Sequence, residues 1–488
     1  MKSVFFRNNL LWLIAIFFSA NSAFGQTLFF ERVYDETLSQ TSFVIGDNNT
    51  KEAIVIDAQR DIDVYLDIAR KNGLKISKVT ETHIHADFLS GSRELAAVTQ
   101  AVLYLSGEGG EDWQYEFPHK PLKDGDQIQI GSIVLEVMHT PGHTPESLTF
   151  LVKEEAANPI KAITGDFVFV GDVGRPDLLE KAAGQIGSQL VGAKQLYRSL
   201  ERFMKLPDDT EIWPGHGAGS FCGKNLSSIP QSTLGDEKLT NPALQFRGKE
   251  KEFINFILND QPAAPKYFAQ MKHLNKVNRP LLVTVPKVSK LNIQETDVAL
   301  ERGLMIIDAR PKSISERGFI PGSLLIENMR TFSTYMGSLM DYENQIILVA
   351  EENQIEDLTR KLMRIGMDNI YGYITDVNLQ SLPLQEANII DFKDFTTFLK
   401  DSEVQIIDVR SESEYKNGHI PGVENLPLTE LEDNLGKLQK DKPIVIHCQS
   451  GARAAMAYSL LRKNGYDNVV NYSGGINDWI EKKNELVK

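Results

Sequence analysis

Residues 81–88 have the sequence ETHIHADF and follow an apolar run that predicts a β-strand. Side chains of an extended segment point to the same side every two residues, so His83, His85 and Asp87 are expected on one side of the chain. Further imidazole and carboxylate groups occur in three short segments, which are TPGH ending at His143, TGD ending at Asp166 and WPGH ending at His216. A lone histidine is usually structural, as we expect for His139, but four such segments together predict a metal site.

A mixed pattern of strands and helices surrounds this stretch, from Thr27 to about Trp213. Short apolar or alternating runs predict strands, and longer stretches with a helical period predict helices. The strand-like runs are 53–56, 102–105, 128–137 and 148–152, and the helical stretches are 62–71 and 190–204. These patterns indicate a large α/β unit, followed by a polar helical tail over 241–278 that Pro262 and Pro265 interrupt.

The C-terminal part of the chain contains an internal repeat. Residues 306–322 and 406–422 align without gaps and are identical at nine of seventeen positions. A shorter match joins 346–350 to 444–448. Each repeat has the order strand, turn, strand, helix, which predicts a small α/β domain with buried parallel strands.

The length of the chain agrees with this division, and its charge argues against two classes of partner. At roughly 150 residues per domain, a chain of 488 residues corresponds to about three domains. The 52 Lys and Arg residues against 66 Asp and Glu residues give a net charge of −14. This acidic balance argues against nucleic acid or an anionic membrane as a partner.

The first 25 residues have the pattern of a secretory signal. Basic residues precede an apolar run over 10–20, and small residues follow at 23–25. The run is too short to span a bilayer comfortably, so we expect cleavage rather than an uncleaved anchor, no stable membrane span afterwards, and an exported, periplasmic protein. One disulfide between Cys222 and Cys448 would be a poor framework for so long a chain, and two working thiols are expected instead.

The order of the four histidine- and aspartate-bearing segments resembles the metallo-β-lactamase family over roughly residues 27–265. The resemblance implies an αββα sandwich with a metal site at its edge. In that family the motif HxHxDH, a later His, an Asp and a last His build a two-metal site. Here Phe88 stands where the motif ends in His, so a second metal would lose a nitrogen ligand and a mononuclear site is expected.

The persulfide dioxygenases are the members that this chain resembles most. They hold one ferrous iron with the first His of HxH, the later His and the Asp, which implies His83, His143 and Asp166 as ligands here. Two imidazoles and one carboxylate suit a non-haem Fe(II) oxygenase, so one Fe(II) per chain is expected, with Zn²⁺ and a hydrolytic water as the alternative. The remaining candidates, which would orient the ligands or themselves bind metal, are His85, Asp87 and His216.

Two further residues enter through the same resemblance. The stretch GDVGRPD over 171–177 resembles a GxGRxD segment whose Arg helps to hold the thiol carrier, which implies substrate binding by Arg175. A salt-bridged surface turn is the alternative. The stretch PGHGAGSFCG over 214–223 is similar to persulfide dioxygenase–rhodanese fusions and implies that Cys222 lies beside the metal site, with a buried structural cysteine as the alternative.

The last repeat contains a reactive-thiol loop, VIHCQSGAR over 445–453. Cys448 stands between a buried strand and a helix predicted from about Ala452 to Lys463. Backbone N–H groups and the positive helix end can face its sulfur and favour the thiolate.

The CxxGxR spacing of this loop resembles the rhodanese family. It implies Cys448 as the nucleophile and Arg453 as a residue that helps to hold an anionic substrate. The loop of low-molecular-weight phosphatases, CxxxxxR, is one residue longer. The middle repeat has Ala350 where Cys448 aligns, so we expect it to be an inactive, structural rhodanese.

Together these motifs predict an α/β multidomain protein, with an αββα metallo-β-lactamase sandwich and two rhodanese-like α/β domains with parallel sheets. The expected units are a signal peptide over 1–25, the metal unit over 26–265, the inactive repeat over 266–385 and the active repeat over 386–488.

The expected function is oxidation of glutathione-type or coenzyme A-type persulfides by O₂ to sulfite and thiol, coupled to sulfur transfer by Cys448 that gives thiosulfate. The expected partners are the persulfide, O₂ and sulfite, and a homo-oligomer is left open. The alternatives are a zinc-dependent, glyoxalase II-like thioester hydrolase and an exported sulfur relay with a non-catalytic metal domain.

Overall fold

The computed structural model describes residues 27–488 except 155–156, 179, 181–186 and 380. The predicted signal peptide over 1–25 lies outside the described residues. Within the described ranges, no helix has both the length and the apolar character needed to cross a membrane.

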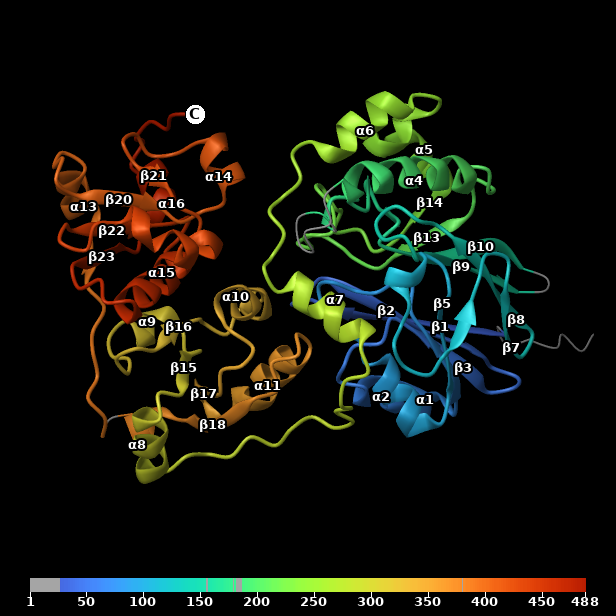
Figure 1. Ribbon diagram of the computed structural model, residues 1–488, viewed down its shortest axis with the longest axis horizontal. Helices are drawn as coiled ribbons and strands as arrows, with labels where there is room; N and C mark the ends of the chain where they lie inside the picture. The colour runs from blue at the N-terminus through green and yellow to red at the C-terminus, as the bar shows by residue number, and fades with distance from the viewer. Residues whose placement is uncertain (1–26, 155–156, 179, 181–186, 380) are drawn as a thin grey trace, which may run out of the picture.

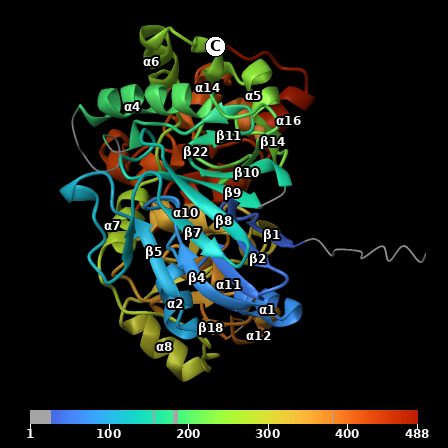
Figure 2. The ribbon, with the colours of Figure 1, turned by 90° about the vertical axis from the view of Figure 1, so that its right-hand side faces the viewer.

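Two mixed β-sheets pack face to face in the first part of the described chain (Figure 1, Figure 2). Their strand orders are β1-β2-β3-β4-β5-β6 and β14-β13-β10-β9-β8-β7. Because alternate residues of a strand point to opposite faces, each sheet contributes one set of apolar side chains, such as Phe43 and Phe150, to a shared core. The first sheet contains β1 (Leu28–Asp35), β2 (Gln40–Asp47), β3 (Glu52–Ile56), β4 (Lys75–Thr80), β5 (Val102–Ser106) and β6 (Lys120–Leu122). The second contains β7 (Gln127–Ile130), β8 (Ile133–His139), β9 (Leu148–Glu154), β10 (Ala157–Gly165), β13 (Glu211–Pro214) and β14 (Ser232–Thr233), and a separate short ladder joins β11 (Val168–Phe169) to β12 (Asp172–Val173).

Helices cover the outer face of each sheet. α1 and α2 pack on the first sheet through Tyr65 and Leu95, whereas α4 and α6 pack on the second through Leu196 and Phe253. The predicted αββα sandwich is therefore confirmed. The helices of this unit are α1 (Asp63–Asn72), α2 (Ser92–Thr99), α4 (Ser188–Phe203), α5 (Leu234–Thr240) and α6 (Glu250–Leu258), with 3₁₀ turns at Glu111–Trp113 and Pro242–Phe246.

Two predicted extended stretches differ in detail. The apolar run 128–137 forms the hairpin of β7 and β8, which turns at Gly131 with a φ of 56°. A Cβ atom at that glycine would lie 2.2 Å from Oδ2 of Asp47. Both the positive φ and this close approach therefore favour glycine over any residue with a side chain. Residues 81–88 form an irregular segment after β4 rather than an extension of the strand.

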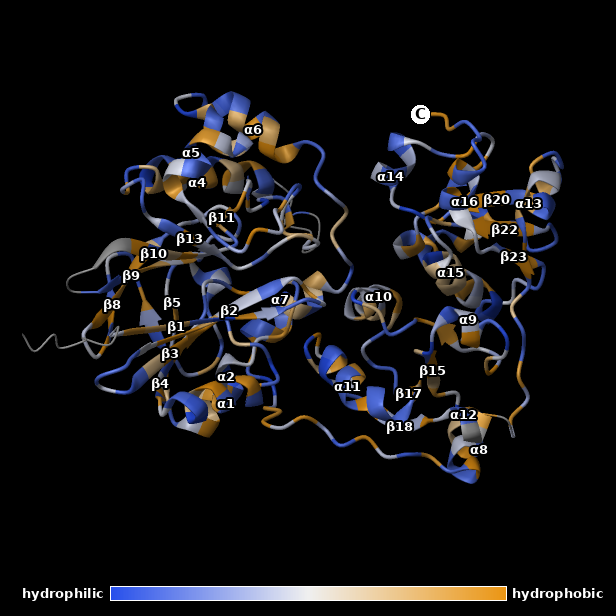
Figure 3. Cartoon of the chain, turned by 180° about the vertical axis from the view of Figure 1, so that it is seen from behind, coloured by the Kyte–Doolittle hydropathy of each residue, from blue (hydrophilic) through white to orange (hydrophobic). Residues whose placement is uncertain are grey.

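Each C-terminal repeat forms a parallel sheet, as its strand pattern predicts (Figure 1). The middle repeat has the order β16-β15-β17-β18 and the last repeat has β19-β23-β22-β20-β21. Figure 3 shows the hydrophobic colouring of β20 and β22, in keeping with strands that are covered on both faces. The middle repeat contains α8 (Ile293–Glu301), β15 (Met305–Asp308), α9 (Lys312–Ser315), β16 (Leu324–Leu325), α10 (Phe332–Leu339), β17 (Ile346–Val349), a 3₁₀ turn (Glu352–Gln354), α11 (Ile355–Met363), β18 (Ile370–Ile374) and α12 (Asp376–Leu379). The last repeat contains β19 (Ile389–Ile390), α13 (Phe392–Phe398), β20 (Gln405–Asp408), α14 (Glu412–Asn417), β21 (Glu424–Asn425), 3₁₀ turns (Leu428–Glu430 and Glu432–Lys437), β22 (Ile444–His447), α15 (Ala452–Lys463), β23 (Val469–Tyr472) and α16 (Gly475–Glu481).

The residues that both repeats share make the same buried contacts. In the middle repeat, Arg310 donates to both carboxylate oxygens of Asp308 and, at 2.7 Å, to the carbonyl oxygen of Gly318. The residues one hundred positions later make the same three contacts in the last repeat. These identities therefore mark an ion pair that joins the first strand to the following loop, and not a catalytic group.

Helix α7 (Phe268–Lys276) is held by the metal unit, beyond the boundary predicted at residue 265. Asn275 on this helix donates to the carbonyl oxygens of His85 and Phe88, each at 2.8 Å. Arg279, which follows the helix, pairs with buried Glu94 at 2.5 Å. The first unit thus uses residues that the sequence pattern assigns to the middle repeat.

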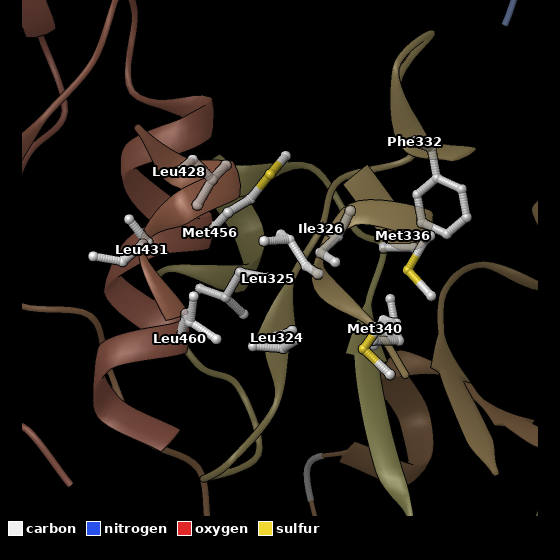
Figure 4. Packing of buried hydrophobic residues seen from close by; sticks show 14 of the residues in the cluster. Leu324, Leu325, Ile326, Phe332, Met336, Met340, Leu428, Leu431, Met456 and Leu460 are labelled. Atoms are coloured by element: carbon white, nitrogen blue, oxygen red, sulfur yellow. The ribbon is translucent and has the colours of Figure 1, made fainter. Parts of the chain in front are cut away.

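The middle repeat is packed on two sides. Toward the metal unit, Arg364 pairs with Asp61 at 2.5 Å and Arg360 pairs with Asp63 at 2.6 Å. Toward the last repeat, Figure 4 shows the side chains of residues 324–326 pointing between those of α10 and those of the last repeat, among them Leu428 and Leu460. One hydrophobic cluster runs through all three parts.

Candidate metal and thiol sites

Three side chains from separate loops meet at one edge of the sandwich. His83 follows β4, His143 lies between β8 and β9, and Asp166 follows β10. Nε2 of His143 lies 3.5 Å and Nε2 of His83 lies 3.8 Å from Oδ2 of Asp166. All three residues are at least 97% buried. Each offers one ligand atom, and these atoms lie within 4.8 Å of one another.

Hydrogen bonds on the far side of each ring leave these ligand atoms available. Nδ1 of His143 donates to the carbonyl oxygen of Arg175 at 2.9 Å, and Nδ1 of His83 lies 2.9 Å from the hydroxyl oxygen of Thr82. Among the described residues, Nε2 of His83 and Oδ2 of Asp166 are buried without a hydrogen-bond partner. Unpaired buried nitrogen and carboxylate atoms that face one another are costly unless a cation lies between them, so this group fits a metal ion.

Charge at the group favours a cation. Burial lowers the pKa of His83 well below its usual value and also lowers the pKa of His143, so both rings stay neutral and can use Nε2 as a ligand. Burial would raise the pKa of Asp166, but the positive charge of His216 outweighs it and holds the pKa well below its usual range. The group therefore combines two neutral imidazoles with one carboxylate.

Asp57 is a residue of this site that sequence analysis did not single out. It follows β3 with a φ of 57° and is fully buried. Its carboxylate accepts hydrogen bonds from the backbone and the hydroxyl of Thr82 at 2.7 and 2.9 Å, and from Nε2 of His85 at 3.0 Å. Asp57 thus orients Thr82, and through it the ring of His83. The sequence did offer one signal for this role, because Asp57 directly follows a predicted buried strand.

His85 lies outside the group of three ligand atoms. Burial alone would lower its pKa, but the carboxylate of Asp57 raises it to about 9. The centroid of its ring lies 4.4 Å from that of Phe88, the buried residue that stands where the HxHxDH motif ends in His. His85 therefore forms an ion pair beside the metal group.

His216 bridges two carboxylates. Its Nδ1 donates to Asp166 and its Nε2 donates to Asp87, each at 2.6 Å. Burial would lower the pKa of His216, but the two carboxylates raise it well above its usual value. With both nitrogens used as donors, His216 orients Asp166 rather than presenting a lone pair to a metal.

Cys222 lies beside this bridge, within 4.8 Å of the ligand atoms of Asp87 and His216. It is a free, buried thiol. Burial and the nearby carboxylates of Asp166 and Asp87 raise its pKa well above the usual value, so it is protonated. The structure thus brings Cys222 next to the metal group, as the fusion-like stretch implies.

Arg175 does not lie where a substrate could reach it. Its side chain is 0% exposed, and Nε and Nη2 donate to the two carboxylate oxygens of Asp177 at 2.7 and 2.8 Å. Nη1 donates to the carbonyl oxygen of Phe221. The expectation that Arg175 binds the thiol carrier is corrected, because its guanidinium is buried and bonded to protein groups. It supports the loops that carry His143 and Cys222 instead.

The thiol loop of the last repeat follows β22, and α15 begins at Ala452 as predicted. Cys448 is 1% exposed, and the backbone N–H of Gly451 donates to its sulfur at 3.1 Å. Gly451 has a φ of 96°, which turns its N–H toward the sulfur. The loop can therefore stabilise negative charge on this sulfur or on one bonded to it.

Arg453 reaches a carboxylate that the sequence did not indicate. Its two terminal nitrogens donate to the two oxygens of Glu414 on α14, at 2.6 and 2.8 Å. Burial would raise the pKa of Glu414, but Arg453 lowers it to about 2. An anionic substrate would have to share Arg453 with this glutamate. In the middle repeat, Ala350 follows β17 where Cys448 follows β22, and Glu351 and Glu352 come next.

Comparison with known proteins agrees with these two sites. Residues 36–216 match the metallo-beta-lactamase superfamily, and residues 391–482 match the rhodanese-like domain. A crystal structure of a metallo-beta-lactamase from Staphylococcus aureus subsp. aureus COL is 41% identical, covers 72% of this chain and 99% of its own, and has a TM-score of 0.67. The mitochondrial persulfide dioxygenases ETHE1 of Bos taurus and Homo sapiens are each 28% identical; the matches cover 48% and 46% of this chain and 82% and 80% of those proteins. The chain belongs to the metallo-beta-lactamase superfamily, as a fusion of a domain homologous to persulfide dioxygenases with a C-terminal rhodanese-like domain.

Proposed function

We propose that this protein oxidises low-molecular-weight persulfides, of the glutathione or coenzyme A type, with O₂ at one Fe(II), and that it transfers sulfane sulfur through Cys448. The observation that carries the proposal is the buried group of His83, His143 and Asp166, whose ligand atoms face one another. Homology to persulfide dioxygenases and the rhodanese-like domain support an enzyme of sulfur metabolism.

The protein groups around the metal have defined roles in this proposal. His83, His143 and Asp166 would hold the ion and leave coordination positions open, and Fe(II) supplies the chemistry with O₂ when bound. Thr82 and the carbonyl of Arg175 keep both Nε2 atoms directed at the ion. One persulfide, one O₂ and one water then give one thiol, one sulfite and two protons.

The second reaction takes place at Cys448. Its thiolate bonds to the terminal sulfur of a persulfide, the S–S bond of the carrier breaks, and the carrier leaves as a thiol with the proton. The N–H of Gly451 stabilises the charge of the resulting cysteine persulfide. Sulfite then bonds to the outer sulfur, thiosulfate leaves, and the thiolate of Cys448 is restored. Sulfite from the first reaction is thus consumed in the second.

The test is O₂ uptake by anaerobically iron-loaded protein that is offered glutathione persulfide or coenzyme A persulfide. We expect uptake with sulfite as the product, and thiosulfate when excess persulfide remains. Absence of uptake together with thioester hydrolysis by the zinc-loaded protein would replace the proposal with a glyoxalase II-like hydrolase. Absence of stoichiometric metal would favour a sulfur relay.

We also propose export to the periplasm, on the pattern of the first 25 residues. N-terminal sequencing of the mature protein from its native host tests this. A mature chain that begins at residue 1 would contradict it.

A further inference from the structure

A cavity of about 330 Å³ lies where the three parts of the chain meet. The metal unit contributes Phe221 and residues 261–265, and the middle repeat contributes residues of α10. The last repeat contributes Glu414 and Arg453, together with its 3₁₀ turn at Leu428–Glu430. We call this space the junction cavity. Its volume is in the range of pockets that hold small organic ligands.

One end of the junction cavity reaches the thiol site. Arg453 lines the cavity and lies on the first turn of α15, directly after the loop of Cys448. Tyr335 of α10 lines it as well. A thiol carrier that contacts Arg453 in the cavity would therefore lie next to the loop that carries the nucleophile.

The other end adjoins a narrow pocket that extends toward the residues around the metal group. Phe221, Thr331 and Thr334 line the junction cavity and also line a second, narrow pocket of about 20 Å³. Asp87, which bonds to His216, also lines this narrow pocket. Its volume suits a group the size of one water molecule or one sulfur, not a whole carrier. A carrier in the junction cavity could thus extend its terminal sulfur past Phe221 toward the metal.

The middle repeat is what joins the two ends. Its helix α10 contacts the metal unit at Gly337, where a Cβ atom would lie 2.6 Å from the ring of Tyr267. Figure 1 shows α10 between α7 and the two sheets of the repeats. The repeat without a nucleophile therefore lines both the junction cavity and the narrow pocket.

The lining also indicates the kind of carrier. Arg453, which the ligand would share with Glu414, suits a carboxylate, whereas the exposed carboxylates of Glu412 and Glu430 suit an ammonium group. Phosphate groups would meet these glutamates unfavourably. Such a lining fits a small zwitterionic peptide thiol better than a large phosphorylated one.

We propose that the junction cavity is a single binding site that presents one glutathione-type thiol carrier to both the metal centre and Cys448. This inference rests on the proposed function and narrows its substrate class. It predicts that one non-reactive ligand blocks both reactions with one affinity.

The probe is S-methylglutathione, which has the charges of the carrier but no reactive sulfur. We expect it to compete with glutathione persulfide in O₂ uptake by the iron-loaded protein and in Cys448-dependent thiosulfate formation from added sulfite, with the same inhibition constant. Two constants that differ by more than about tenfold would overturn the single site. S-methyl coenzyme A is expected to inhibit at least about tenfold more weakly, and equal inhibition would overturn the assignment of the carrier class.

Two variants fill the cavity from two different units of the chain. Ala263→Trp lies in the metal unit and Thr429→Trp lies in the last repeat, and both positions line the cavity. We expect each to raise the inhibition constant and the KM of both reactions by at least about tenfold, including the reaction of the other domain. The matched control is Ala269→Trp on the exposed side of α7, which should change neither the inhibition constant nor the KM of either reaction.

The outcomes separate this inference from the function on which it rests. If Ala263→Trp impairs only O₂ uptake and Thr429→Trp impairs only sulfur transfer, two separate carrier sites exist and the inference is wrong. Unchanged metal content and melting temperature show that a loss is not caused by misfolding. If the wild-type protein consumes no O₂ with any persulfide, the proposed function fails before the variants are compared.

Discussion

Asp177→Asn distinguishes a buried structural role of Arg175 from the substrate-binding role that the sequence implied. The substitution leaves Arg175 in place with a neutral partner, at a site where Arg175 is 0% exposed and the Asp177 side chain is 1% exposed. Removing one member of a buried ion pair typically costs about 3–5 kcal/mol, because the other charge stays buried without compensation. We therefore expect the free energy of unfolding of the metal unit to fall by about that amount, which lowers its folding equilibrium constant by roughly two to four orders of magnitude.

The assay is urea unfolding followed by tryptophan fluorescence in a Trp479→Phe background, so that Trp113 and Trp213 report the metal unit. Asp67→Asn is the matched control, since Asp67 pairs with Arg70 at 2.8 Å but both side chains are mostly exposed. An exposed pair contributes about 0–1 kcal/mol, so this control should unfold almost like the wild type. A loss below about 1 kcal/mol in Asp177→Asn, together with a raised KM for the persulfide, would refute the reasoning and restore Arg175 as a carrier-binding residue.

Further predictions concern the two candidate sites. His83→Ala removes one of three ligand atoms, and elemental analysis should find far less than one metal per chain; full metal content would exclude it as a ligand. Cys448→Ser should abolish thiosulfate formation and leave O₂ uptake unchanged, whereas parallel loss of both would argue against separable sites. Arg453 outweighs burial and lowers the pKa of Glu414 from 4.5 to about 2, so the pair should contribute fully to stability above about pH 4.5 and lose that contribution as the pH falls toward 2. Melting temperatures from pH 5 to 2 should therefore fall more steeply in the wild type than in Glu414→Gln, and parallel curves would contradict the pairing. Ala350→Cys, made in the Cys448→Ser protein, should not restore thiosulfate formation, because two glutamates follow residue 350 instead of an anion-binding loop.

Local patterns were sufficient for much of the fold. Hydrophobic runs predicted β3, β5 and β9 within one or two residues, and the helix after Cys448 begins and ends as expected. The repeated sequence predicted two parallel sheets, because strand and turn signals lie within a few residues of one another. The run 128–137 was not resolved into two strands, since Gly131 in a mostly apolar stretch is a weak turn signal.

Contacts between distant parts of the chain were not predictable in this way. Arg175 was expected to face a substrate, but whether a charged residue is exposed depends on the loops that fold over it. Glu414 lies 39 residues before Arg453, and no local pattern links the two. Asp57 orients Thr82 across neighbouring strands, a role that appears only when β3 and β4 pair in parallel.

The sequence by itself determined the ligand types, the thiol loop and the number of α/β repeats, because each depends on residues that are close together along the chain. Only the tertiary structure decided which lone pairs face one another, which charges are buried, and that one cavity is lined by all three parts of the chain. These properties depend on the packing of side chains from separate parts of the chain, where a difference of a few ångströms decides between a ligand, an ion pair and a cavity wall.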